Sequence, residues 1–431
     1  YMLMPINVVS YSMVVLDEVH LLQDISMYTL EVVLRTLNDL ISSGIPLIML
    51  SATIPSVLEH QLTSLGIQCN IVRWRGNPVD VDIDPLVKGV TINDEEIATR
   101  IKEFLREYSY SPDVLVIVNT VDRAVALYTR LKNKIDDYQI ILIHGRFCDS
   151  DRMLRESKLE LLSRSRRLGK AMRRLLVIAT QVAECGLDYP FDMVITEVAP
   201  IDALIQRVGR VRGHGKAYIY GVLGPEPYDV NILNLTENVV KSKVDVLMKS
   251  PRNVVASKEL LDEVYTSEVI NNLRERSLYS FERRLRRFYD YLTSLNVIRN
   301  PAIEVTIRPN TYVELLPISN QCLTNIIKQL VDDYVTFNKD TLVYEEVLRN
   351  VKHGYIVRVE LSPYLFKLHD GKFLPDGKLG SALRVFNGKA LRVEFSIDHL
   401  KVLHDDTLIP YSLYLIPETL YSSELGLLTL R

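Results

Sequence analysis

Short apolar runs alternate with stretches of helical hydrophobic spacing along the first half of the chain. Apolar runs that end at polar residues are typical of buried strands, and apolar residues spaced by three and four are typical of packing helices. The predicted strands are residues 12–16, 45–50, 114–118, 140–143, 175–179 and 193–195. The predicted helices are residues 28–40, 95–108 and 123–135, with another that begins at Pro200. Repeated strand-then-helix units predict a parallel sheet with helices on both faces.

The second half of the chain has a different pattern. Residues 230–295 have largely helical spacing. From Pro301 onward, segments rich in Val, Ile and Tyr, such as 355–361 and 391–397, alternate with turn sequences such as 369–371. This order predicts a helical linker followed by a small mixed α/β domain.

Composition limits the classes of protein to which the chain can belong. At 431 residues and 47% hydrophobic, it can bury substantial cores, and its length predicts two to three domains. The net charge of -3 gives no overall attraction for nucleic acid, so such binding would depend on local basic patches. The four cysteines are far apart and are interpreted as reduced thiols. No apolar run reaches the roughly 18 residues of a membrane span and no leader is recognisable, so we expect a cytoplasmic protein with no membrane partner.

Polar sequences follow the predicted strands. They are LDEVH at 16–20, SATIP at 51–55, VNTVDRA at 118–124, IHGRFCDSDR at 143–152 and a long string at 177–215. Loops at the carboxyl ends of parallel strands are where open α/β sheets bind ligands. Each sequence also has an ordinary interpretation, for example an acidic turn at Asp17-Glu18 or a helix cap at Ser51.

The helix that begins at Pro200 has a pattern suited to a phosphate. Gln206 and Arg210 are four residues apart and share a face, with Arg207 beside them and Gly209 allowing close backbone approach. A guanidinium fork aimed from a helix fits a phosphate better than an apolar core. Alone, the pattern is equally typical of a solvated basic helix, but the other strand-end sequences favour the functional interpretation.

Together, the five sequences occur in the order that superfamily 2 helicases use, and the series resembles the CRISPR-associated superfamily 2 helicase of type I interference systems. The resemblance depends on HGRF followed by Asp151-Arg152 and Glu156, on ATQVAE, and on APID-x-LIQR-x-GR, and it covers roughly residues 14–215. It implies an α/β fold with tandem RecA-like parallel sheets, the first of them incomplete. It also implies three partners: single-stranded DNA, a guide-RNA surveillance complex, and an HD nuclease that is upstream or on a separate subunit.

The resemblance assigns one group of residues to ATP and Mg²⁺. Asp17 would hold the magnesium ion through water, and Glu18 would position and activate the attacking water, as phosphoryl transfer requires. His20 would couple the nucleotide site to the loop Ser51-Ala52-Thr53, although a capping or core role for this histidine also fits the sequence.

The later motifs are divided between nucleic acid and nucleotide. The side chains assigned to nucleic-acid phosphates are those of Asn119, Thr120, His144, Arg146 and Thr180. The residues assigned to the nucleotide are Gly186, Asp188, Arg207, Gln206 and Arg210. Of these, the last two would face the triphosphate, where an arginine neutralises developing charge.

Arg212 departs from the family pattern Gly-Arg-x-x-Arg. It lies one position early, and Gly213 stands where the arginine is expected. On a continuous helix Arg212 would point roughly 100° away from the expected direction. Two alternatives stay open: the helix ends early and Arg212 also reaches the phosphate, or Arg210 acts alone.

The phosphate-binding sequence G-x-x-x-x-G-K-[ST] is absent from the 431 residues. Superfamily 2 helicases place it before the DExH sequence, so we interpret the chain as a fragment and expect it to be inactive alone. The pairs His369-Asp370 and His404-Asp405 lack further ligands at suitable spacing, so we reject both as metal sites. Two arginine-rich segments, residues 163–174 and 273–292, fit either a nucleic-acid surface or a solvated helix face.

We divide the chain into five regions from these patterns. They are the second half of a RecA-like domain (residues 1–78), a connector (79–90), a second RecA-like domain (91–225), a helical linker (226–300) and an accessory domain (301–431). The predicted function is that of an ATP-dependent single-stranded DNA translocase and helicase in a CRISPR type I antiviral system. Two alternatives remain: another DExH helicase acting on RNA or repair intermediates, and a non-hydrolysing subunit that binds nucleic acid.

Overall fold

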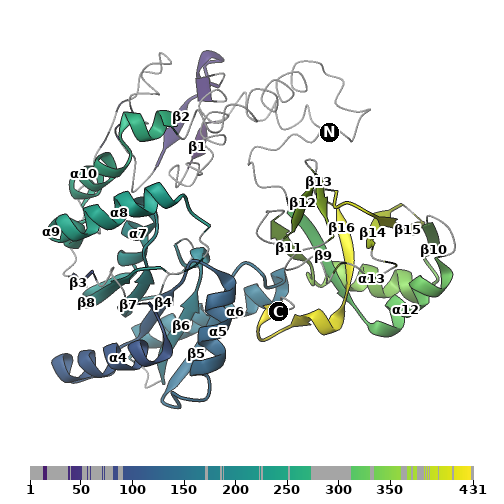
Figure 1. The fold of residues 1–431 in the computed structure, drawn as a ribbon, viewed down its shortest axis with the longest axis horizontal. Helices are drawn as coiled ribbons and strands as arrows, with labels where there is room; N and C mark the ends of the chain where they lie inside the picture. Colours follow the sequence, from purple (N-terminus) through teal and green to yellow (C-terminus); the bar gives the residue numbers. More distant parts are fainter. Residues whose placement is uncertain are drawn as a thin grey trace. The chain divides into compact units, whose positions relative to one another are not determined.

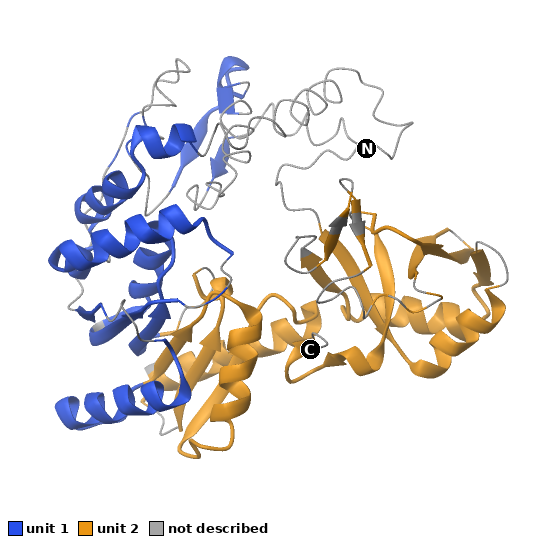
Figure 2. Cartoon of the chain, in the orientation of Figure 1, with its two compact units in different colours: residues 1–112, 190–309 blue, residues 113–189, 310–431 orange. Residues whose placement is uncertain are grey.

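The structure of the chain is a computed structural model, shown in Figure 1. It describes residues 13–16, 37–38, 40–50, 56, 59, 70, 72, 81–85, 91–169, 173–184, 187, 189–222, 224, 227–250, 253–272, 312–330, 334–360, 366–369, 372–375, 383, 385, 387, 389–396, 398–409 and 412–428. The chain divides into two compact units, each built from two segments distant in sequence (Figure 2). Unit 1 comprises Tyr1–Pro112 and Pro190–Pro309, and unit 2 comprises Asp113–Tyr189 and Asn310–Arg431.

Unit 1 contains two sets of parallel strands. β1 (Val14–Leu16) pairs with β2 (Leu47–Met49), which confirms the two strands predicted in this part of the chain. β3 (Val81–Asp84), β8 (Val211–Tyr220) and β7 (Phe191–Glu197) pair in parallel in that order. β3 lies inside the segment predicted as a connector. Its alternating sequence forms a strand because every second side chain turns inward and is buried.

Helix α4 (Asp94–Tyr108) confirms the helix predicted at residues 95–108, and its ends follow from local sequence. The Asn93 side chain accepts a hydrogen bond from Glu96 N at 2.9 Å, which caps the amino end. Ser109 ends the helix in the left-handed conformation, with φ of 61°. Ile97 and Phe104, seven residues apart, have no exposed surface, so the predicted apolar face is the one that packs.

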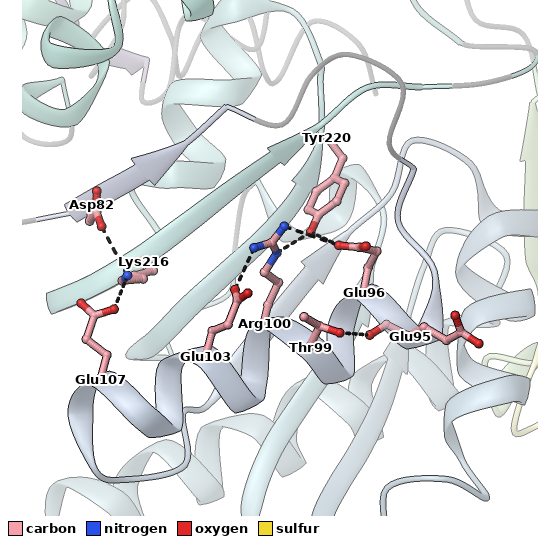
Figure 3. Close-up of polar contacts among 9 residues, drawn as sticks. All are labelled: Asp82, Glu95, Glu96, Thr99, Arg100, Glu103, Glu107, Lys216 and Tyr220. Atoms are coloured by element: carbon pink, nitrogen blue, oxygen red, sulfur yellow. Dashed lines mark hydrogen bonds and ion pairs between the residues drawn. The ribbon is translucent and has the colours of Figure 1, made fainter.

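Another face of α4 makes polar contacts with the strands of unit 1 (Figure 3). Arg100 Nε donates to the Tyr220 hydroxyl of β8 at 3.0 Å. Farther along, the Lys216 ammonium of β8 forms ion pairs with Asp82 of β3 and Glu107 of α4. Burial raises the pKa of Tyr220, so its hydroxyl stays protonated and can donate as well as accept. These contacts fix the helix against the β3–β8 pair.

The remaining helices of unit 1 are α7 (Ile201–Val208), α8 (Val230–Ser242), α9 (Val244–Lys249) and α10 (Val254–Val264). α8 and α10 each begin with a side-chain cap, at Asp229 and Asn253 respectively. These helices confirm the predicted helical character of residues 230–264. The arginine-rich segment 273–292 lies outside the described residues.

The first segment of unit 2 is a parallel α/β half-domain. β4 (Val114–Ile117), β6 (Arg174–Ala179) and β5 (Tyr138–Ile143) pair in parallel in that order. α5 (Val121–Leu131) follows β4, and α6 (Asp149–Arg167) follows β5. All residues of β4 are buried, as in a strand covered on both faces. The predicted alternation of strand and helix is therefore confirmed.

The second segment of unit 2 is a mixed α/β domain around a sheet with the order β10-β15-β14-β16-β9-β11. The strands are β9 (Tyr312–Ile318), β10 (Tyr334–Asn338), β11 (Val357–Glu360), β14 (Ala390–Phe395), β15 (His399–Asp405) and β16 (Leu413–Pro417). β16 and β9 pair in parallel, whereas the other pairs are antiparallel. α12 (Asn320–Gln329) and α13 (Leu342–Lys352) share an apolar core with one face of this sheet. The predicted mixed domain is therefore confirmed.

Short elements complete this segment. β12 (Lys367–His369) pairs with β13 (Lys372–Leu374), and η3 (Glu418–Leu420) leads into β17 (Tyr421–Ser422), which pairs with β18 (Gly426–Leu427). The second core of the sheet contains Val313, Tyr414 and Ile416 together with Cys148 from the first segment and Leu427 from β18. The two segments of unit 2 therefore share a core. Among the described residues, no helix has the length and apolarity needed to cross a membrane.

Candidate functional site

Three parallel strands of unit 2 bring the predicted nucleic-acid residues to one edge of the sheet. Ile117 of β4 and Ile143 of β5 both lie beside Ala179 of β6. The residues that follow these strands, including Asn119 and Thr180, therefore emerge together. Thr180 N donates to Ile143 O at 3.3 Å, which extends the pairing past the strand ends. This is the edge at which α/β sheets bind ligands.

Local hydrogen bonds hold the two loops after β4 and β6. The Thr120 hydroxyl caps α5 by accepting from Arg123 N at 3.4 Å, and Asn119 O accepts from Gln181 Nε2 at 2.9 Å. Asn119 and Thr180 are each 2% exposed, whereas Thr120 is half-buried. Of these three predicted contacts, Thr120 presents the most side-chain surface.

His144 lies at the same edge but has no exposed surface. Its Nδ1 accepts a hydrogen bond from Arg146 N at 3.2 Å, so the proton lies on Nε2, which donates to Leu425 O at 3.1 Å. Burial, followed by the nearby Arg146 charge, lowers the pKa of His144 to about 3. The ring is therefore neutral at physiological pH, with both nitrogens occupied.

Arg146 is also largely buried, with 9% of its surface exposed. Its guanidinium forms an ion pair with Asp122 at 2.7 Å, at the start of α5. The two basic side chains predicted to meet nucleic acid in this loop, His144 and Arg146, are thus engaged within unit 2.

In unit 1, the structure ends the arginine-bearing helix earlier than the sequence predicted. α7 begins after Pro200 as predicted, but it stops at Val208, and Arg210 lies in the turn that precedes β8. Val211 already pairs with β7, so the chain has too few residues for another helical turn. Gln206 and Arg210 therefore do not share the face of one continuous helix, as the spacing had suggested.

Arg212 lies in a bulge of β8 rather than on a helix. Residues 191–193 of β7 lie opposite residues 211–216 of β8, so the longer stretch bulges out of the pairing. Gly215 allows the backbone of β8 to come close to Asp192 of β7, because a Cβ atom at this position would lie within 2.3 Å of Asp192 O. The angle of roughly 100° expected on a helix between Arg212 and the family's arginine position, here Gly213, does not apply to this geometry.

Arg207 is the largest side chain without exposed surface in the described part of the chain. Its guanidinium donates to the Thr196 hydroxyl at 3.1 Å, to Glu197 O at 3.2 Å and to the Tyr228 hydroxyl at 3.1 Å. It links α7 to β7 and to the segment before α8. Arg207 has no exposed surface with which to contact a nucleotide as predicted, because its guanidinium donors face inward.

Other predicted site residues lie outside the described residues. They are Asp17, Glu18, His20, Ser51, Ala52, Thr53, Gly186 and Asp188. Their roles around ATP and Mg²⁺ stay predictions. Among the residues that the structure does describe, no group of three or more His, Cys, Asp or Glu side chains is arranged to hold a metal ion.

One buried polar centre of unit 2 was not apparent from the sequence. The Asp113 carboxylate, with no exposed surface, accepts from Leu175 N and from the Tyr189 hydroxyl, each at 2.8 Å, and pairs with Arg166 at 2.9 Å. Burial raises its pKa. Arg166 belongs to the basic run predicted as a possible nucleic-acid surface, so part of that run has a structural partner.

Parallel strands with polar loops at their carboxyl ends, followed by an arginine-bearing turn, are features of a RecA-like α/β fold. Residues 111–216 match the family model described as CRISPR-associated nuclease/helicase Cas3, C-terminal. The chain is 28% identical over 322 residues to the CRISPR-associated helicase Cas3 of Thermoproteus tenax, covering 73% of this chain and 51% of that protein.

Solved structures agree on the fold. The structure of T. fusca Cas3-AMPPNP is similar with a TM-score of 0.57 and 18% identity, covering 95% of this chain and 52% of that one. A chain of a CRISPR RNA-guided surveillance complex, pre-nicking, is similar with a TM-score of 0.53 and 16% identity, covering 95% and 54%. The chain is similar to CRISPR-associated helicases named Cas3 and spans about half the length of these proteins.

Proposed function

We propose that the chain is the motor part of an ATP-dependent helicase that translocates along single-stranded DNA in a CRISPR type I antiviral system. The observation that carries the proposal is the grouping of the loops after β4, β5 and β6 at one sheet edge of unit 2. Backbone and hydroxyl donors at such an edge suit the phosphates of a nucleic-acid strand. The helicase relatives and the AMPPNP-bound neighbour support this assignment.

In this proposal, ATP hydrolysis uses the residues assigned by resemblance. Asp17 holds Mg²⁺, Glu18 orients the attacking water, and Arg210 stabilises charge on the triphosphate. Thr120 is the most accessible of the described candidates for a DNA phosphate. The partners are single-stranded DNA, a guide-RNA surveillance complex and an HD nuclease; the similarity to a chain of a surveillance complex supports the second of these.

ATP turnover tests the proposal. The 431-residue chain is compared with a longer protein that also carries a G-x-x-x-x-G-K-[ST] loop upstream, each with single-stranded DNA, with RNA or without nucleic acid. We expect turnover from the longer protein, stimulated by DNA, and none from the present chain. Replacing the loop lysine by alanine is the control for contaminating ATPases.

The alternatives give different results in the same assay. Stimulation by RNA rather than DNA favours another DExH helicase. Absence of turnover from both proteins favours a non-hydrolysing subunit that binds nucleic acid.

A further inference from the structure

The last described residues of the chain form a hairpin that lies against the predicted nucleic-acid loop of unit 2. This C-terminal hairpin, residues 421–428, contains β17 and β18, and its target is the segment 144–151 between β5 and α6. The His144 ring donates to Leu425 O at 3.1 Å, and Leu427 N donates to Arg146 O at 2.9 Å. The hairpin therefore contacts the ring of His144 and the backbone of Arg146, the two basic residues that the sequence assigned to nucleic acid.

Tyr421 fixes one end of the hairpin. Its hydroxyl donates to Asp151 Oδ2 at 2.6 Å, and it accepts from Cys148 N at 3.0 Å. Burial raises the pKa of Tyr421, as does its hydrogen bond to Asp151, so the phenol keeps the proton that it donates. The Cys148 thiol lies beneath it, without exposed surface.

Charged groups fix the tip of the hairpin. The Glu424 carboxylate accepts from the Tyr128 hydroxyl at 2.8 Å and pairs with the Lys132 ammonium, both on α5. The Arg155 guanidinium donates to Ser423 O. Lys132 and Glu424 are about half exposed, with side-chain exposures of 50% and 44%. Pairs at this exposure contribute little stability, because water and salt screen them.

Gly426 brings the hairpin closest to the loop. Its φ is +75°, and a Cβ atom there would come within 2.7 Å of both Arg146 O and His144 Cε1. The first of these neighbours is backbone and has little freedom to move. Any larger residue at this position therefore has to push the hairpin away from His144 and Arg146.

We propose that the C-terminal hairpin is a latch: closed, it shields His144 and Arg146, and open, it exposes both side chains to the phosphates of a single-stranded nucleic acid. This inference rests on the proposed function for its ligand. Two observations support a separable latch. The tip of the hairpin is held by a half-exposed ion pair, and the segment that it contacts carries two basic side chains with little exposed surface.

Thiol alkylation measures opening of the latch without any nucleotide or nucleic acid. Cys148 and Cys322 are both buried, but Cys322 lies in the α12–α13 core and makes no hairpin contact. We expect Gly426→Val to raise the rate of Cys148 alkylation by N-ethylmaleimide about tenfold or more, measured by peptide mass spectrometry, because the added side chain displaces the hairpin. The rate at Cys322 should stay unchanged.

Gly169→Val is the matched control variant. Gly169 also has positive φ, +67°, in unit 2, but a Cβ atom there meets nothing within 4 Å. It imposes similar backbone strain without displacing the hairpin, so Cys148 should remain protected. An unchanged Cys148 rate in Gly426→Val overturns the latch. Faster alkylation of both cysteines overturns it too, because the hairpin is then an inseparable part of the fold.

Binding of a fluorescent single-stranded DNA oligonucleotide tests the shielding. We expect Gly426→Val to bind at least about fivefold more tightly than the unaltered chain, and addition of Arg146→Ala to remove that gain. Equal or weaker binding by Gly426→Val, in a chain whose Cys148 has become reactive, overturns the shielding role. If neither protein binds the oligonucleotide, the proposed function fails, while the Cys148 rates still decide whether the hairpin opens.

Discussion

The guanidinium of Arg207 and the hydroxyl of Thr196 are 3.1 Å apart in the interior of unit 1, and neither side chain has exposed surface. Arg207 belongs to a string whose arginine spacing suggested phosphate contacts. The structure separates the members of that string: Arg207 points inward, whereas Arg210 and Arg212 are half-buried after the helix. A sequence of closely spaced arginines can thus combine a structural residue with candidate ligands.

The burial of Arg207 leads to a stability prediction. Arg207→Ala should lower the free energy of unfolding by about 3–5 kcal/mol, because it opens a cavity and leaves inward-facing acceptors unsatisfied. Chemical denaturation followed by tyrosine fluorescence or circular dichroism measures this loss. Arg164→Ala, at a side chain that is 68% exposed, is the control and should change stability by less than about 1 kcal/mol. In the longer protein that carries the phosphate-binding loop, a stable Arg207→Ala that fails to bind nucleotide would restore the ligand role.

Asp113 leads to a second stability prediction. Asp113→Ala should lower the free energy of unfolding by about 3 kcal/mol, because it leaves Leu175 N and the Tyr189 hydroxyl in the core without their acceptor. Asp113→Asn keeps an acceptor and should lose less. Asp137→Ala, at an exposed position, serves as the control. The thermal melting temperature orders the three variants, and equal values for Asp113→Ala and Asp137→Ala would show that the cluster contributes nothing.

Glu18 is the predicted residue that activates water. In a longer protein with the phosphate-binding loop, Glu18→Gln should abolish ATP turnover while leaving nucleotide affinity unchanged, because the carboxylate orients water and does not hold phosphate. Turnover and binding of a fluorescent ATP analogue are measured on the same preparation. Persistent turnover removes Glu18 from this role.

Arg210 and Arg212 can be separated by kinetics in the same longer protein. Arg210→Ala should lower the rate of hydrolysis by about a thousandfold, as for an arginine that stabilises a transferring phosphoryl group. Arg212→Ala should have a much smaller effect, because Arg212 lies beyond Val211 in the β8 bulge. Equal losses would mean that the bulge brings both guanidinium groups to the phosphate.

The sequence predicted most of the regular elements from β1 to α7, because local periodicity decides them. Apolar residues spaced by three and four located α4. In the structure, Asn93 caps its amino end and Ser109 ends it. The parallel pairing of β4, β6 and β5 followed from their order with the intervening helices. Through that pairing, the meeting of the strand-end loops was also predictable.

The sequence could not predict features that depend on distant pairing. α7 ends at Val208 because the following residues join β7 in a sheet, whereas the sequence interpretation placed Gln206 and Arg210 on one helix face. The hydrogen bond between His144 and Leu425 joins residues 281 positions apart, and neither residue carries a local sign of the other. For His144, long-range packing therefore decides whether the ring is a ligand or a buried structural group.

His144 provides a final prediction through its pKa, which is about 3 in the folded chain compared with an ordinary value of 6.5. Between these two values the unfolded chain binds a proton that the folded chain does not, so stability is full above pH 6.5 and falls as pH decreases toward 3. The loss is about 1.4 kcal/mol per pH unit. His144→Gln cannot titrate, so its melting temperature should fall less than that of the unaltered chain between about pH 7.5 and about pH 5. His353→Gln, at an exposed histidine, controls for the substitution itself. Identical acid sensitivity of the unaltered chain and His144→Gln would show that burial does not keep this ring neutral.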